Sequence, residues 1–208
     1  MKIIVTSGPT RSYLDEIRYI SNYSTGVLGS LIAARAALQG HQVVQLYGKG
    51  SIFAADKRVK KIEIETVDEL LRALKKELKS GAQAVVHAMA VLDYIAPKKI
   101  KAKVKSDKKS WHIKLLRSPK IINEIKKIAP QTKLVGFKLE YNAKKGGLLK
   151  SARELIKKSG AEYVVANDFK SVKEKKHTAM IIGKSGFIKG NISGKENIAK
   201  EIVELLTR

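Results

Sequence analysis

Short apolar runs alternate with longer amphipathic stretches along most of this chain, and this alternation limits the possible folds more than any other feature. The segment Val67–Lys79 has the spacing of an amphipathic helix. Its residues Leu70, Leu74 and Leu78 fall on one face. Ala82–Met89 is continuously apolar, as expected of a strand buried on both faces. Strands that alternate with helices of about ten residues or more are typical of βαβ units, which build a parallel sheet.

The remaining segments follow the same alternation. Strands are expected at Lys2–Thr6, His41–Tyr47, Lys60–Thr66, Trp111–Leu116, Lys133–Leu139 and Ala161–Ala166. Helices are expected at Val27–Gln39, Pro119–Ile128, Leu148–Ser159 and Glu196–Leu206, and a hairpin at Thr178–Ile188. The sequence therefore predicts one α/β domain over residues 1–208, with a Rossmann-like, mostly parallel sheet, helices on both faces, and a small β-hairpin and flap extension. Ligands of such folds bind outside the carboxyl ends of the strands, so the loops after Thr6, Met89, Gly136 and Ala166 are candidate site loops.

Residues 98–109 interrupt the pattern, because seven of these twelve positions are lysine. The lysines are Lys98, Lys99, Lys101, Lys103, Lys105, Lys108 and Lys109. No apolar face runs through the segment, so we expect a mobile, basic flap.

The loop after the first strand carries small hydroxyl residues and glycines that lead into a helix. These residues are Ser21, Ser24, Thr25, Gly26 and Gly29. Free N–H groups at a helix N-terminus bind anions, which predicts a phosphate-binding loop. The loop is neither a dinucleotide fingerprint nor a Walker A motif. The alternative is an ordinary helix start in which Ser24 or Thr25 is the N-cap.

Composition narrows the function classes. The chain has no cysteine, which excludes disulfides, thiolate metal sites and a cysteine nucleophile, and a cytoplasmic setting is expected. No stretch approaches the length of a membrane span. The formal charge of +23 favours phosphorylated ligands and also permits nucleic-acid binding. Such a basic nucleic-acid-binding module is the alternative function, but only 6% of the residues are aromatic, which argues against it.

Six ordered blocks of sequence carry a family resemblance. Residues 5–29 read VTSGPTRSYLDEIRYISNYSTGVLG, close to the pattern V-T-(S/A)-G-(G/P)-T, D-x-V-R-x-I-(S/T)-N and S-S-G. The later blocks are AMAVLDY at 88–94, PKKIK at 97–101, LRSPKII at 116–122, KLVGFKLE at 133–140 and VAND at 165–168. Together these blocks resemble the signature of phosphopantothenate–cysteine ligases.

This resemblance implies an enzyme of coenzyme A biosynthesis. The carboxylate of 4′-phosphopantothenate would attack the α-phosphorus of CTP or ATP, with Mg²⁺ on the phosphates, and cysteine would then displace the nucleotide. A homodimer is expected from the family. Met1 lies one residue before the first predicted strand. We therefore expect a monofunctional ligase that holds no flavin and works with a separate flavin-dependent decarboxylase.

Three catalytic residues are carried over from the family. Asn22 is expected to contact the intermediate, although an Asx-turn is its alternative role. Arg18 is expected to bind phosphate or carboxylate through its planar fork, or else to pair with Asp15 or Glu16 on the surface. Lys101 is expected to stabilise the triphosphate. This sequence reads K-I-K-A at residues 99–102, where the family pattern has K-I-K-K. The choice of lysine within the flap therefore stays open.

Further residues are expected to line the nucleotide and substrate sites. Asp93 and Phe137 leave strand ends and are expected beside the nucleotide, where Phe137 could instead be a core residue. The other nucleotide-binding residues are Gly8, Ser24, Thr25, Gly26, Ala88, Met89, Ala90, Lys99 and Lys101. Asn167 and Asp168 are expected to bind substrate together with Arg18 and Asn22, with a simple turn as their alternative.

The histidines predict no metal site, because no pair of them has metal-ligand spacing. His87 lies inside an apolar run and is expected to be a hydrogen-bonded core residue. Tyr94 and Lys98 have the Y-x-x-x-K spacing of short-chain dehydrogenases. The intervening Pro97 and the missing glycine fingerprint indicate that this dehydrogenase-like spacing is coincidental.

Overall fold

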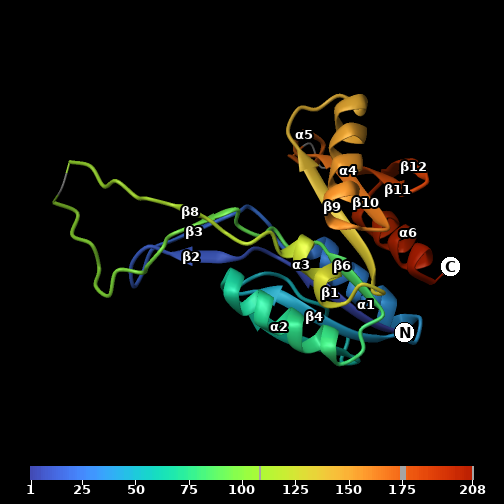
Figure 1. The fold of residues 1–208 in the computed structure, drawn as a ribbon, viewed down its shortest axis with the longest axis horizontal. Helices are drawn as coiled ribbons and strands as arrows, with labels where there is room; N and C mark the ends of the chain where they lie inside the picture. Colours follow the sequence, from blue (N-terminus) through green and yellow to red (C-terminus); the bar gives the residue numbers. More distant parts are fainter. Residues whose placement is uncertain (108, 174–176, 208) are drawn as a thin grey trace.

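The computed structural model of the protein describes residues 1–107, 109–173 and 177–207 (Figure 1). Lys108 of the expected flap lies outside these described residues. The strands of the main sheet are β1 (Lys2–Ser7), β4 (Gln42–Gly48), β5 (Val59–Ile64), β6 (Ala84–His87), β9 (Lys133–Glu140), β10 (Tyr163–Asp168), β11 (Thr178–Gly183) and β12 (Gly186–Ser193). The helices are α1 (Val27–Leu38), α2 (Val67–Lys79), α3 (Ile121–Ile128), α4 (Lys145–Ser159), α5 (Phe169–Lys173) and α6 (Lys195–Thr207).

The main sheet has eight strands in the order β12-β11-β10-β9-β6-β1-β4-β5. The pairs from β10 to β5 are parallel, whereas β10–β11 and β11–β12 are antiparallel. The mostly parallel α/β fold expected from the sequence is therefore confirmed. The antiparallel edge comes from the predicted hairpin, which continues past Ile188 to Ser193.

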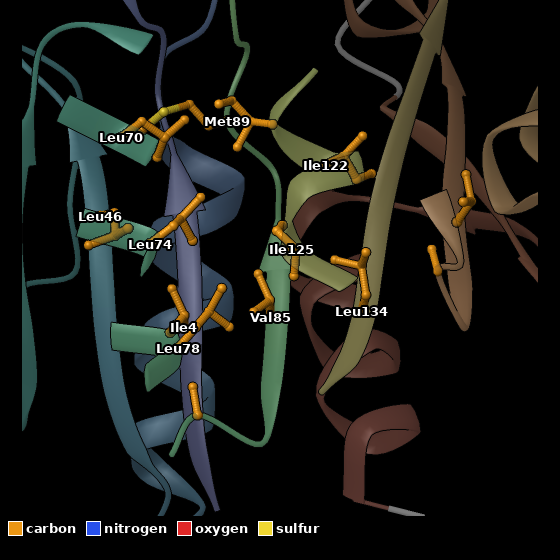
Figure 2. Close-up of a cluster of buried hydrophobic side chains, with 14 of the residues drawn as sticks. Ile4, Leu46, Leu70, Leu74, Leu78, Val85, Met89, Ile122, Ile125 and Leu134 are labelled. Atoms are coloured by element: carbon orange, nitrogen blue, oxygen red, sulfur yellow. The ribbon is translucent and has the colours of Figure 1, made fainter. Parts of the chain in front are cut away.

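Two apolar clusters form the core, one on each face of the sheet. Helices α2, α3 and α4 cover the face that carries Ile4 and Val85, as Figure 2 shows for α2 and α3. Helices α1 and α6 pack together over the opposite face, which carries Ile3 and Val86. Alternate residues of β1 and β6 thus enter different clusters, as the period-two geometry of strands requires. The layers bring the carboxyl ends of β1, β6, β9 and β10 to one edge.

A long arm extends away from the sheet in Figure 1. It comprises residues 11–21 and 94–117, without the undescribed position 108, and contains β2 (Arg11–Tyr13), β3 (Tyr19–Ser21), β7 (Tyr94–Ile95) and β8 (Leu116–Arg117). Strands β2 and β3 form an antiparallel hairpin within the loop after β1, which the sequence pattern had not indicated. The expected flap runs in this arm, where the Ile100 N–H donates to the Leu14 carbonyl at 3.0 Å.

The predicted strand at Trp111–Leu116 is wrong. Residues 111–115 form no regular element, and β8 contains only Leu116 and Arg117. The apolar residues Trp111, Ile113 and Leu115 do alternate along the segment, but all three are exposed on the arm. Alternation predicts a strand only where a sheet lies beside the chain to pair with it and a core lies below to bury one face.

Candidate active site

Helix α1 begins without a side-chain cap at the carboxyl end of β1. Its N-cap is Gly26, with φ 81°, and within the described part of the chain no side-chain cap accepts a hydrogen bond from the first turn. The alternative in which Ser24 or Thr25 caps the helix is therefore wrong. The first N–H groups of α1 keep their capacity to bind an anion, and the helix dipole adds partial positive charge there.

Glycines allow the backbone to come close at this helix start. A Cβ on Gly29 would lie 2.3 Å from the Ser7 Cβ, so Gly29 lets α1 pack directly against β1. A Cβ on Gly26 would lie 2.5 Å from the Ile52 carbonyl oxygen. The Ile52 N–H also donates to the Thr25 carbonyl at 2.9 Å, so the loop before β5 supports the loop before α1.

The segment after β6 forms a second wall of the site. The Ala90 N–H donates to the Gly8 carbonyl at 2.9 Å, which joins this segment to the loop after β1. The side-chain amide of Asn22 donates from Nδ2 to the Val91 carbonyl at 3.0 Å. Asn22 therefore lies against the second wall while the rest of its side chain stays exposed.

An ion pair joins Asp93, in the segment after β6, to Lys120, directly before α3. Their Oδ1 and Nζ atoms lie 2.7 Å apart, with side-chain exposures of 59% and 52%. A pair this exposed is worth little in free energy, because water and salt screen it. Either group can therefore exchange its partner for a charged or polar ligand atom at little cost.

The walls enclose a cleft of about 870 Å³ at the carboxyl edge of the sheet. The predicted residues that line it are Gly8, Asn22, Ser24, Thr25, Gly26, Ala88, Met89, Ala90, Asp93, Phe137 and Asn167. This volume lies in the upper part of the range of small-molecule sites, so the cleft can hold a nucleotide and part of a second substrate. The structure thus brings eleven of the predicted site residues together, while their individual roles remain predictions.

Four predicted site residues do not line the cleft. Lys99 pairs with Glu16 at 2.8 Å on the arm, and Lys101 is exposed on the arm as well. Arg18 donates from Nη1 to Asp15 at 2.8 Å and to the Val104 carbonyl at 3.0 Å.

Asp168 is the fourth predicted site residue outside the cleft. Its Oδ1 accepts from the backbone N–H groups of Asn142 at 2.7 Å and Lys170 at 3.2 Å. This arrangement is the turn role that was the alternative for Asp168.

Several lining residues were not expected from the sequence. They include Tyr23, His87, Lys120, Lys158, His177 and Lys195. Lys120 could have been noticed, because it lies in the block LRSPKII at 116–122, which carries part of the family resemblance. The others are brought to the cleft by the packing of distant elements, as when Tyr23 meets the Phe169 ring edge-on at a centroid distance of 5.9 Å.

The described residues contain no group of three or more histidine, cysteine or acidic side chains that could hold a metal ion. The carboxylates that line the cleft, Asp93, Glu140 and Glu154, do not form such a group. None of the helices in the described ranges is long and apolar enough to cross a membrane.

Comparisons with known proteins match the whole chain. The sequence model of the family described as "DNA/pantothenate metabolism flavoprotein C-terminal domain" matches residues 1–208. The Coenzyme A biosynthesis bifunctional protein CoaBC of Thermococcus kodakarensis is 36% identical over 184 residues, which are 88% of this chain and 45% of that protein. The protein of the same name from Escherichia coli is 31% identical over 81% of this chain and 41% of its own length. The chain thus spans about half the length of the curated relatives that it matches.

Solved structures share the fold. The DNA/pantothenate metabolism flavoprotein from Streptococcus pneumoniae superposes with a TM-score of 0.90 and 28% identity, over 100% of this chain and 98% of that one. A mutant of Cab2 in complex with phosphopantothenate-cysteine superposes with a TM-score of 0.79 and 18% identity, over 99% of this chain and 86% of that one. At that identity the second likeness concerns the fold alone.

Proposed function

The chain belongs to the DNA/pantothenate metabolism flavoprotein C-terminal domain family, and from this membership we propose that it is a ligase of coenzyme A biosynthesis. It joins 4′-phosphopantothenate to L-cysteine in two steps. First, a carboxylate oxygen attacks the α-phosphorus of a nucleoside triphosphate, and pyrophosphate leaves. Then the cysteine amine attacks the acyl carbon, loses a proton and releases the nucleoside monophosphate as the amide forms. A flavin-dependent decarboxylase would then act on the product.

The observation that carries this proposal is that one cleft is lined both by the uncapped N-terminus of α1 and by Asn22. The reaction needs no side-chain nucleophile, because positioning and charge neutralisation do most of the catalytic work. The N-terminus of α1 offers free N–H groups for a phosphate. Asn22 is held at the opposite wall by its bond to Val91, and its amide can contact an oxyanion or an attacking amine.

The nucleoside triphosphate is CTP or ATP, and the experiment below includes both. Mg²⁺ would be held mainly by the triphosphate oxygens. This fits a cleft whose carboxylates Asp93, Glu140 and Glu154 do not gather into a metal-binding group. The bound ion would neutralise charge on the phosphates, and the chain's own part is to orient them.

The position of the arm supports a homodimer. Arg18, Lys99 and Lys101 lie on the arm, away from the cleft of their own chain. The arm also exposes apolar side chains, among them Ile17, Ile100 and Ile113 at 59%, 45% and 41%. Such a surface is typical of an interface. We propose that the arm of one copy packs on a second copy and brings its basic residues to that copy's cleft.

Pyrophosphate release tests the proposed reaction. The purified protein is incubated with 4′-phosphopantothenate, Mg²⁺ and either CTP or ATP. We expect release with one nucleotide, and a fall of about a hundredfold in Asn22→Asp and in Lys101→Gln, because each loses a group that stabilises developing charge. Lys75→Gln, which removes an exposed lysine on α2, is the matched control and should keep full activity. No release with either nucleotide from folded protein would refute the proposal.

A mixing experiment tests the role of the arm. Asn22→Asp is defective in the cleft, and Lys101→Gln is defective in the arm. If the arm acts on the partner's cleft, a heterodimer of the two variants contains one site with both native residues, so mixing should restore activity. If the arm acts on its own cleft, both sites stay defective and mixing restores nothing. The protein should sediment at twice its mass of 23.0 kDa.

A further inference from the structure

His87 is a buried residue of the cleft to which the proposed reaction assigns no role. It is the last residue of β6, is 7% exposed, and contributes to the lining of the cleft. The expectation of a hydrogen-bonded core histidine holds for only one of its two ring nitrogens. The other nitrogen has a different environment.

The hydrogen bonds around Thr6 define the tautomer of His87. The Thr6 hydroxyl oxygen accepts from the Met89 backbone N–H at 3.2 Å. The same hydroxyl lies 2.9 Å from Nδ1 of His87. Among the described residues, Nδ1 is the one acceptor within hydrogen-bond distance of this buried hydroxyl, so the hydroxyl hydrogen is left unpaired unless it is donated to Nδ1. Nδ1 is then the acceptor, and the ring hydrogen of the neutral imidazole lies on Nε2.

The Nε2–H group has no hydrogen-bond partner among the described residues. Among the described residues, the buried side-chain polar atoms without a hydrogen bond are Arg35 Nε, His41 Nε2 and Asn123 Oδ1. Nε2 of His87 is not among these enclosed atoms, and no described residue bonds to it. Since the rest of the ring is buried, Nε2 must be open towards the cleft that His87 lines. The neighbouring position across the sheet is Gly136, which has no side chain to cover the ring.

The imidazole stays uncharged in this position. Burial and, to a smaller extent, the positive charge of Lys120 lower the pKa of His87 to about 4. At neutral pH the residue is therefore a fixed, neutral donor. A neutral donor contributes little to neutralising a triphosphate, but it suits an oxygen or ring nitrogen of a nucleoside.

We propose that His87 is a ligand-binding residue whose Nε2–H donates to an acceptor atom on the nucleoside part of the bound nucleotide. This inference rests on the proposed function. The nucleotide is favoured over 4′-phosphopantothenate because the residues directly after His87, Ala88–Ala90 and Asp93, form the wall expected at the nucleotide. Thr6 is then a positioning residue, because it holds the ring in the donating tautomer.

Titration calorimetry with CTP and with ATP tests this role. His87→Phe keeps a ring but removes the donor, and should weaken binding of the preferred nucleotide about three- to tenfold, the range expected for one neutral hydrogen bond. His87→Gln restores an N–H donor at the end of its side chain and should lie between that variant and the wild type. His41→Gln, beside the amino end of β4, is the control and should bind like the wild type. A folded His87→Phe variant with unchanged affinity would overturn the inference.

Nitrogen-15 NMR of histidine-labelled wild-type protein tests the same role without any substitution, so its result does not depend on whether a variant folds. The spectrum should show His87 as the Nε2–H tautomer at pH 7. Its Nε2 signal should shift with saturating CTP or ATP, but not with 4′-phosphopantothenate alone. An Nδ1–H tautomer, or a signal that no nucleotide moves, would overturn the role of His87 while nucleotide binding stands. If neither nucleotide binds the wild type, the proposed function falls together with the inference.

Discussion

The carboxylate of Asp15 accepts a hydrogen bond from the Val104 backbone N–H at 3.1 Å, across 89 residues of sequence. Arg18 donates to the carbonyl of the same residue, so both backbone groups of Val104 are bonded to one turn. Asp15 is fully buried and also accepts from the N–H groups of Ile17 and Arg18. Burial alone would raise the pKa of Asp15, but these backbone bonds and Arg18 hold it below its usual value. The turn between β2 and β3 therefore anchors the lysine-rich segment of the arm.

Asp15→Ala should release this segment. The Val104 N–H would lose its acceptor, and we expect its protection against hydrogen exchange to fall on the order of tenfold or more. The core amides of β1 should keep their protection, because the arm lies outside the main sheet. Amide exchange measured by NMR checks both expectations. Unchanged protection at Val104 would show that other contacts hold the arm.

Gly29→Ala should destabilise the protein, because the added Cβ would lie 2.3 Å from the Ser7 Cβ. Helix α1 would have to move off β1, at a cost of about 1–3 kcal/mol in the free energy of unfolding. Gly146→Ala in α4 is the matched control, since a Cβ there meets nothing within 4 Å. It should stabilise by roughly 0.5–1 kcal/mol. Chemical denaturation of the two variants gives the comparison, and equal effects would contradict the close packing of α1.

Glu77 should contribute stability that depends on pH. Burial alone would raise the pKa of Glu77, but Lys60 at 2.7 Å and Lys2 at 2.9 Å hold it below its usual value. The unfolded chain has the ordinary glutamate pKa of about 4.3, so this stabilisation is present above that pH and is lost as the pH falls through the lower folded-state pKa.

Glu77→Gln should lower the free energy of unfolding by about 1–3 kcal/mol at pH 7. The difference from the wild type should shrink as the pH falls below 4. Thermal unfolding across pH 3–7 checks this. Asp68→Asn removes an exposed carboxylate from the same helix and should show a loss below about 1 kcal/mol. A Glu77→Gln deficit that does not change with pH would contradict the role of the charge.

The elements that follow local rules could be predicted from the sequence. Helix α2 has the bounds expected for Val67–Lys79, because its apolar face is continuous and Thr66 and Glu69 form a capping box at its start. The family expected from the motifs is confirmed by a family model that spans the chain. Strands β2 and β3 were missed, because each has only three residues and their pairing depends on a turn built around buried Asp15.

The site could be predicted best where its residues follow strand ends. Gly8 and Ala90 reach the cleft because they follow β1 and β6, parallel strands that end at the same edge of the sheet. Phe137 also lines the cleft, but it lies inside β9, which continues to Glu140 instead of ending before Phe137 as the sequence had suggested. The positions of Arg18 and Lys101 outside the cleft could not be predicted. A sequence motif specifies which residues are present, but not that the segments carrying them extend away from the sheet. The free Nε2–H of His87 depends on Thr6, which lies 81 residues earlier, and no local pattern encodes such a contact.

The most direct test of the central claim is the mass of the product formed with isotope-labelled cysteine. The wild-type protein is incubated with 4′-phosphopantothenate, Mg²⁺, and CTP or ATP, with and without the labelled amino acid. With cysteine, we predict a product whose mass equals that of the two substrates less one water, together with one nucleoside monophosphate for each amide. Without cysteine, the acyl-nucleotide should be found on the protein. Nucleotide hydrolysis with no labelled amide, from folded protein that binds both substrates, would contradict the account.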